Sequence, residues 1–113
     1  LQTVQLDSQQ MLLVVDALVS RAVNASRENG WVRVSLQNGA GKLQLSIVNE
    51  SEALSDEQRE SLFKIVGSER MNKMSLNLVL ARLIVEAHGG QLAAMAATDS
   101  GLTGTEVRLT IKI

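Results

Sequence analysis

The chain contains neither cysteine nor proline, and aromatic residues make up only 2% of its 113 residues. Without cysteine it can form no disulfide, no thiolate metal site and no cysteine nucleophile. Its only aromatic residues, Trp31 and Phe63, are too few for the stacking surfaces that bind single-stranded nucleic acid. A single histidine, His88, rules out a histidine-rich metal site. These absences exclude several classes of catalytic and binding protein.

An excess of charge of one sign is also missing, because 11 Lys and Arg residues stand against 12 Asp and Glu residues. This balance argues against nucleic acid as a partner and against contact with an anionic membrane. No apolar run approaches the roughly 20 residues that span a bilayer, and no signal peptide is visible. Because the first residue is Leu1 rather than methionine, we expect one domain, residues 1–113, taken from a longer protein.

What is present is typical of a globular domain, with 45% hydrophobic and 20% charged residues. Apolar residues at helical spacing predict three helices, the second of which begins with a capping box. Alternating apolar residues predict four strands. The predicted helices are Asp7–Ser26, Ser55–Val66 and Ser75–Ala87, and the predicted strands are Trp31–Gln37, Leu43–Asn49, Gln91–Ala97 and Thr105–Ile113. This order predicts an α/β two-layer sandwich whose helices cover one face of a sheet.

Short motifs in the chain have structural explanations. The dipeptide Asn38-Gly39 is a hairpin signal. The segment Gly39–Lys42 lacks the first glycine and the final hydroxyl residue of a phosphate loop, so we predict a hairpin turn there too. His88 ends the third helix and has no nameable catalytic partner, so we predict that it caps or packs against the helix end. Gly89 or Gly90 should adopt the left-handed conformation that follows the helix. We predict no catalytic residue and no metal ligand.

A family resemblance lies in the last third of the chain. Residues 84–90 read Ile-Val-Glu-Ala-His-Gly-Gly, follow a leucine-rich helix, and precede two strands and the pair Gly104-Thr105. This arrangement closely resembles the ATP-binding domain of sensor histidine kinases, a member of the GHKL, or Bergerat-fold, ATPases. Residues 7–22 match the family's first helix without a gap, so the resemblance covers nearly the whole chain. It implies a Bergerat-type sandwich with three helices on one face of a mixed sheet.

The resemblance also implies that two nucleotide-binding boxes of the family have changed. The Mg²⁺-binding asparagine of the first helix falls on Arg21, and the basic residue that often follows it falls on Asn24. The adenine-binding box D-x-G-x-G has Asn49, Ser51 and Ala53 in place of its aspartate and two glycines. A guanidinium has no lone pair for a metal, and a neutral amide accepts a hydrogen bond more weakly than a carboxylate.

The later boxes are changed in part. The G-x-G-L sequence that opens the last helix and meets the phosphates has Ser75 and Asn77 in place of its glycines. Their β-carbons lie where bare backbone should approach a phosphate, although the helix start can still attract an anion weakly. Thr105, in the final Gly-Thr pair, is unchanged.

The function that follows is a degenerate ATP-binding-like domain of a two-component or phosphorelay protein, acting through protein contacts. It would need no cofactor, bind Mg·ATP weakly or not at all, and not be catalytically competent alone. Its partner would be a response regulator, or the helical dimerisation and phosphotransfer domain of the same protein. We expect the domain in the cytoplasm, also if it forms the cytoplasmic part of a membrane-bound sensor. By the resemblance, the phosphoacceptor histidine lies on a separate helical domain, so His88 is not that residue.

Two alternatives stay open. One is a divergent but active kinase domain, in which residues 67–74 close over ATP and Arg70 and Lys73 neutralise the phosphates. The other is the second domain of a dimeric histidine phosphotransferase that docks a response regulator. Whether Mg·ATP binds separates the first alternative from the second.

Overall fold

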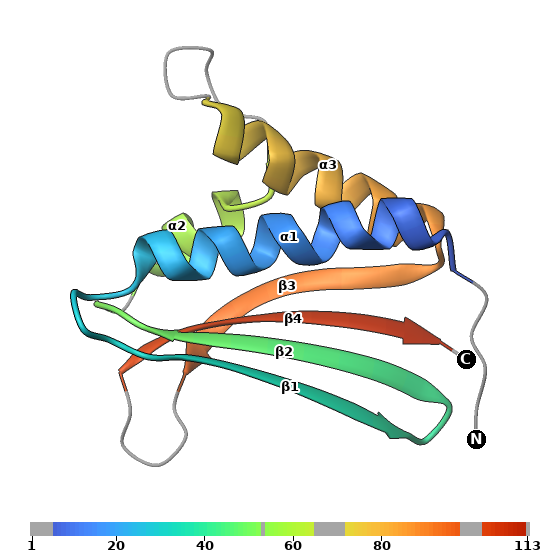
Figure 1. The fold of residues 1–113 in the computed structure, drawn as a ribbon, viewed down its shortest axis with the longest axis horizontal. Coiled ribbons are helices and arrows are strands. Elements are labelled where there is room, and N and C mark those ends of the chain that lie inside the picture. Colours follow the sequence, from blue (N-terminus) through green and yellow to red (C-terminus); the bar gives the residue numbers. More distant parts are fainter. Residues whose placement is uncertain (1–5, 53, 65–71, 98–102, 113) are drawn as a thin grey trace.

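The computed structural model describes residues 6–52, 54–64, 72–97 and 103–112 (Figure 1). The elements in chain order are α1 (Ser8–Ala25), β1 (Val32–Gly39), β2 (Lys42–Glu50), α2 (Asp56–Ser61), α3 (Lys73–Ala87), β3 (Gly90–Ala97) and β4 (Gly104–Lys112). The strands form one sheet in the order β1-β2-β4-β3, and the three helices lie on one of its faces. The predicted α/β two-layer sandwich is therefore confirmed.

The three strand pairs of the described sheet are all antiparallel, which corrects the expectation of a mixed sheet. β2 and β3 run in the same direction, but β4 lies between them and pairs with both. A parallel pair requires two such strands to be neighbours after a crossover connection. The insertion of β4 prevents this for the described strands.

The hairpin between β1 and β2 is confirmed. Its turn lies in the segment Gly39–Lys42, as predicted, and two residues later than the other signal, Asn38-Gly39. Gly39 pairs with Lys42, so Ala40 and Gly41 form the turn. Their φ angles of 54° and 72° are both positive, as a type I′ hairpin turn requires. Asn38 therefore lies within the strand, and every residue of β1 pairs with a residue of β2.

Side chains begin each helix. Asp7 caps α1 as predicted, since its carboxylate accepts the N–H of Gln10 at 2.9 Å. The predicted capping box of Ser55 and Gln58 is present at α2. Helix α2 ends at Ser61, which is earlier than predicted; the last predicted residue of that helix lies outside the described residues.

Helix α3 begins earlier than predicted, which moves its first residues out of the expected loop. Asn72 is the N-cap, and its side-chain oxygen accepts the N–H of Ser75 at 2.9 Å. Ser75 is therefore inside the first turn of the helix rather than at its start. The reason is that asparagine caps a helix as well as serine does, and the cap at Asn72 lets Lys73 and Met74 join the helix.

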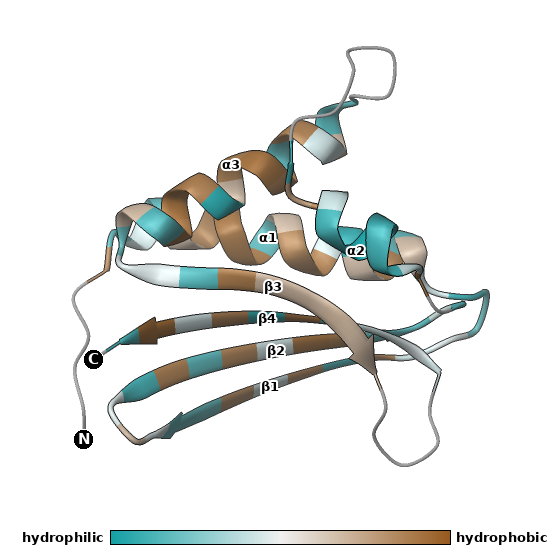
Figure 2. Cartoon of the chain, turned by 180° about the vertical axis from the view of Figure 1, so that it is seen from behind, coloured by the Kyte–Doolittle hydropathy of each residue, from teal (hydrophilic) through white to brown (hydrophobic). Residues whose placement is uncertain are grey.

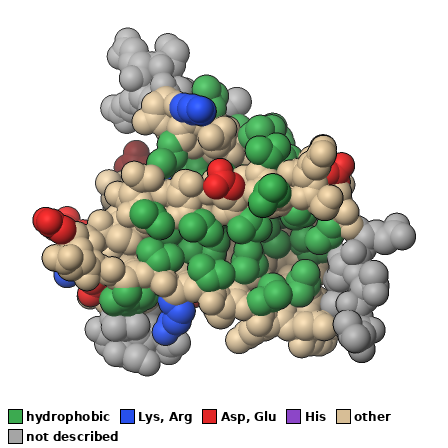
Figure 3. Space-filling model, viewed as in Figure 1, with side chains coloured by type: hydrophobic (Ala, Val, Ile, Leu, Met, Phe, Trp, Pro, Cys, Tyr) green, Lys and Arg blue, Asp and Glu red, His purple; other side chains and the backbone are tan. Residues whose placement is uncertain are grey.

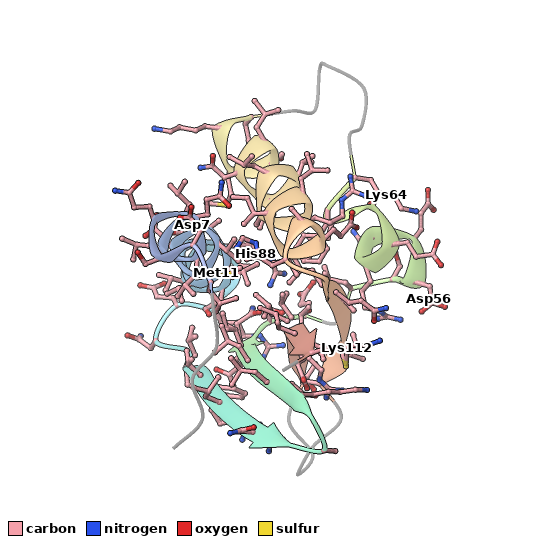
Figure 4. All side chains as sticks on the ribbon, turned by 90° about the vertical axis from the view of Figure 1, so that its right-hand side faces the viewer. Asp7, Met11, Asp56, Lys64, His88 and Lys112 are labelled. Carbon is pink, nitrogen blue, oxygen red and sulfur yellow. The ribbon has the colours of Figure 1, made fainter. Side chains whose placement is uncertain are left out.

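His88 caps the end of α3, as predicted. Its Nδ1 lies 2.8 Å from the carbonyl oxygen of Ile84, and its Nε2 accepts the N–H of Asp7 at 3.2 Å. These partners require a neutral ring that donates from Nδ1 and accepts at Nε2. Gly89 follows with a φ of 76°, the left-handed cap that was expected. The imidazole thus joins the end of α3 to the start of α1 (Figure 4).

The core lies between the helix layer and the two central strands. Hydropathy alternates along the strands, and the brown, hydrophobic stretches of α1 and α3 lie above the sheet (Figure 2). The fully buried apolar side chains include Val14, Leu18, Ile47, Val85 and Val107. In contrast, Val34 and Leu36 on β1 remain exposed, because β1 is an edge strand beyond the cover of α1.

Candidate functional site

Three polar side chains are buried together at one end of the core, and we call Arg21, Asn49 and Thr105 the Arg21 cluster. Their exposed fractions are 6%, 0% and 1%. Arg21 reaches down from α1, while Asn49 and Thr105 are register partners on β2 and β4. The side-chain oxygen of Asn49 accepts a hydrogen bond from Nη1 of Arg21 at 3.1 Å. Asn49 and Thr105 thus follow the buried apolar pair Ile47 and Val107 on the same face of β2 and β4.

The hydrogen-bonding groups of the Arg21 cluster are only partly paired. Within the described residues, Nδ2 of Asn49 and Oγ1 of Thr105 have no hydrogen-bond partner. Arg21 forms no salt bridge with any carboxylate among the described residues. Burial lowers the pKa of Arg21, because removal from water disfavours the charged form. The cluster therefore holds a cation whose charge the described carboxylates do not balance.

Gly104 brings β4 close to this cluster. A β-carbon at Gly104 would overlap the backbone carbonyl oxygen of Asn49. Only a residue without a side chain allows β4 to approach at this point. The unchanged Gly104-Thr105 pair thus has a packing role here, independent of any ligand.

A cavity of about 390 Å³ lies beside Arg21, between the end of α1 and the segment after β2. Its lining residues are Arg21, Ala25, Ser26, Arg27, Ser51, Glu52 and Leu54. Ser51 is buried, and its hydroxyl donates to the backbone oxygen of Glu52 at 3.1 Å. Two of the predicted site residues, Arg21 and Ser51, therefore share one cavity, while Ala53 lies outside the described residues.

The remaining predicted residues are elsewhere. Asn77 lines a second cavity, of about 260 Å³, between α1 and the start of α3. That cavity also contains Asp16, Ser20 and Lys73. Asn24 is exposed on α1, where its side chain donates to the carbonyl oxygen of Ser20 at 2.7 Å. The eight predicted positions therefore do not form one continuous site within the described chain.

Some residues around these cavities had no signal in the sequence. Arg27 and Glu52 join the Arg21 cavity through the folding of two separate segments. A further cavity of about 450 Å³ lies between α2, α3 and β3, and its lining mixes Arg59, Lys64 and Arg82 with Asp56 and Glu60. Figure 4 labels Asp56 and Lys64 near α2. Among the residues that the structure describes, no three His, Cys, Asp or Glu side chains gather to hold a metal ion.

Leucine side chains are exposed on the outside of the helix layer. On α3 they are Leu76, Leu80 and Leu83, which recur at helical spacing, and on α1 they are Leu12 and Leu13. Figure 3 shows further hydrophobic side chains on this face of the molecule, mainly where α1 lies over the sheet. We call the five exposed leucines of α1 and α3 the leucine surface. In the described part of the chain, no helix is long and apolar enough to cross a membrane.

Comparison with known families gives one match over residues 6–113, to the model described as histidine kinase-, DNA gyrase B- and HSP90-like ATPase. The sensor histidine kinase ZraS of Klebsiella oxytoca is 27% identical over 99 residues, which cover 87% of this chain. The chain spans only 21% of the length of that kinase.

Solved structures share the fold. The nucleotide-free catalytic domain of the histidine kinase ThkA has a TM-score of 0.80 and 24% identity, with 96% of this chain and 69% of that chain covered. The mycobacterial sensor histidine kinase MprB has a TM-score of 0.78 and 25% identity, with 94% and 72% covered. Full-length ShkA in complex with AMPPNP has a TM-score of 0.80 and 18% identity, with 98% and 23% covered.

Proposed function

Since the chain belongs to the family of histidine kinase-, DNA gyrase B- and HSP90-like ATPases, we propose that it is a histidine kinase ATP-binding domain that binds Mg·ATP weakly or not at all. The histidine kinase fold and family are the premise of this proposal. The degeneracy of the nucleotide site is the part that needs argument and a test. It depends on one contact, between Arg21 and Asn49.

That contact affects both ends of the ligand that the family binds. By the resemblance, Arg21 stands where the family places its Mg²⁺-binding asparagine, and Asn49 stands where the family's aspartate accepts from adenine. A guanidinium cannot ligate a metal ion. It also uses one of the two lone pairs of the Asn49 side-chain oxygen, which leaves adenine a neutral and therefore weaker acceptor. The residues present therefore do not fit the metal ion of Mg·ATP and would hold its adenine weakly.

The start of α3 supports the same conclusion. An anion at a helix start is bound by the free backbone N–H groups of the first turn. Here the N–H of Ser75 already donates to the side chain of Asn72, at 2.9 Å. A phosphate would have to displace this cap.

These losses are large enough to matter. Each missing hydrogen bond to a buried polar group costs about 1–3 kcal/mol. Two or three such losses move a micromolar dissociation constant to about millimolar or weaker, since about 1.4 kcal/mol is a factor of ten. The domain would then act through contacts with other proteins in the cytoplasm. The leucine surface supports this role, because exposed apolar patches commonly mark protein contacts. The partners we propose are a response regulator or the helical domain of the same protein.

Calorimetric titration with Mg·ATP tests the proposal. We expect no binding at millimolar nucleotide in the original chain. The double variant Arg21→Asn with Asn49→Asp should gain measurable affinity, because it restores a neutral metal ligand and an acceptor carboxylate. Arg27→Asn, a change at an exposed cation of the same cavity, serves as the control and should gain none. A dissociation constant below about 100 μM for the original chain would contradict the proposal; at about 10 mM nucleotide it would stabilise the fold by roughly 2.7 kcal/mol.

The second cavity favours one alternative, an active kinase domain. Lys73 lines it together with Asp16, Ser20 and Asn77, so a cation and polar groups from two helices converge there. Arg70, the other cation of that hypothesis, lies outside the described residues. If this alternative holds, Mg·ATP binds the original chain and Lys73→Ala weakens the affinity about tenfold. If Mg·ATP fails to bind, the alternative left beside our proposal is the second domain of a dimeric histidine phosphotransferase. Binding of a response regulator to the domain would test it.

A further inference from the structure

We propose that Arg21 binds a phosphate oxyanion directly, without a metal ion, in the cavity that it lines. This inference rests on the proposed function, because it concerns the same region of the fold. It differs in predicting a ligand where the proposed function predicts the loss of one. Three features of Arg21 support it, namely its charge, its hydrogen-bonding capacity and its place in the lining of a cavity.

The charge comes from Arg21, whose exposed fraction is only 6%. A buried charge is costly unless an opposite charge or several hydrogen bonds accompany it. Within the described residues, the guanidinium makes one hydrogen bond, to Asn49, which is neutral. It has five N–H donors, so most of them are free for a ligand. An anion beside Arg21 would supply the missing counter-charge.

The hydrogen-bonding capacity of the guanidinium favours a phosphate. The oxygens of a phosphate are acceptors that match the planar fork of a guanidinium, and such charge-assisted hydrogen bonds are short and strong. Asn49 and Thr105 do not line the cavity. Their part is indirect, because the one partner that Arg21 has, Asn49, is neutral and leaves its charge without a counter-charge.

Access is provided by the cavity of about 390 Å³ that Arg21 lines. This volume is far above the roughly 10–15 Å³ that a cavity needs to hold one water molecule, so a phosphate group fits. Arg27 adds a second positive charge to the lining, and Glu52 contributes a negative one. The lining is therefore net positive, in keeping with an anionic ligand.

The test is a thermal-shift and calorimetric titration with sodium phosphate in the presence of EDTA, with sodium chloride at equal ionic strength as reference. We expect phosphate to raise the melting temperature and Arg21→Gln to weaken phosphate binding at least about tenfold, the value of one charged hydrogen bond. Arg27→Gln, at the exposed rim, should weaken it less. Glu52→Gln should strengthen it. ATP with EDTA in place of phosphate distinguishes the source: equal affinity means that the phosphate group suffices, and tighter binding means that a nucleotide supplies it.

Asn49→Asp keeps the inference testable if Arg21→Gln does not fold. The new carboxylate would neutralise Arg21 internally, so the phosphate response should disappear while the fold becomes more stable. The inference is overturned if phosphate has no effect on the original chain, or an unchanged effect on Arg21→Gln or Asn49→Asp. It is also overturned if Glu52→Gln destabilises the phosphate-free fold by several degrees, because Glu52 would then be the counter-ion. Binding of ATP only with Mg²⁺ would contradict the proposed function as well, whereas failure of phosphate alone would leave that function standing.

Discussion

The two ends of the helix layer differ in how completely their polar groups are hydrogen-bonded. At one end, Asp7 and His88 pair the backbone groups that α1 and α3 leave open, and Gly89 completes the turn. At the other end, Arg21, Asn49 and Thr105 are more deeply buried, yet only one hydrogen bond joins them in the described chain. We call these the capped end and the cluster end. Since buried polar groups are nearly always paired in folded proteins, the contrast is the reason why we propose a ligand at the cluster end.

The contrast also separates the residues that match the family pattern for structural reasons from those that differ from it. The histidine followed by two glycines belongs to the capped end, where its hydrogen bonds fully explain it. The residues that differ from the family pattern belong to the cluster end. Removal of the buried polar side chains should therefore stabilise the fold at the cluster end and destabilise it at the capped end.

The largest effect is expected for Gly104→Ala at the cluster end. The new β-carbon would overlap the carbonyl oxygen of Asn49, and neither strand can move without losing pairs. Overpacking of this kind costs about 1–3 kcal/mol, and we expect the upper end of that range. Urea unfolding followed by the fluorescence of Trp31, the only tryptophan, measures it. Gly39→Ala is the control, because no atom lies within 4 Å of its added β-carbon, and it should change stability by less than about 0.5 kcal/mol.

Arg21→Met combined with Asn49→Leu should raise the free energy of unfolding, by about 1 kcal/mol. The double variant replaces the buried charge and its hydrogen-bond partner together by apolar side chains of similar size, and replacing both partners in this way is often neutral or stabilising. The same urea experiment measures the change, with Arg27→Met at the exposed rim as control. A loss of about 3 kcal/mol or more would mean that a carboxylate pairs with Arg21, and the contrast between the two ends would then disappear.

His88→Ala should have the opposite sign and lower stability by about 1 kcal/mol, the usual net value of a hydrogen bond. The variant loses the donor to Ile84 and the acceptor for Asp7 together. Hydrogen exchange at the N–H of Asp7 and in the last turn of α3 should become faster. Asn24→Ala removes an exposed hydrogen bond within α1 and serves as the control. An unchanged stability for His88→Ala would show that the capped end does not depend on this link.

The smallest effect is expected outside both ends, at the hairpin turn. Ala40 has a positive φ of 54°, which asparagine adopts at lower cost. Ala40→Asn creates the Asn-Gly pair preferred in type I′ turns and should raise the free energy of unfolding by about 0.5 kcal/mol. Ala40→Val should lower it, because a branched side chain is strained there. Equal stability of the two variants would contradict the turn geometry.

Much of the fold could be predicted from local patterns in the sequence. The cap at Asp7, the capping box at Ser55 and the left-handed Gly89 depend on residues a few positions apart, so the sequence displays them directly. The errors arose where two neighbouring residues or pairs were equally suitable for the same cap or turn. Asn72 rather than Ser75 caps α3. Of the two predicted turn signals, the one in Gly39–Lys42 forms the turn and Asn38-Gly39 does not. In each case the longer helix or hairpin prevailed, because it forms more backbone hydrogen bonds.

The candidate site was visible in part, through the resemblance to the histidine kinase family. Which of its residues touch was not visible, because Arg21 and Asn49 are separated by 28 positions and carry no periodic signal. Periodicity and capping act along the chain, so the sequence by itself determined the helices, the strands and the apolar layer between them. The burial of an unbalanced guanidinium, and the cavity that opens beside it, depend on how distant segments meet, and only the tertiary structure decided them.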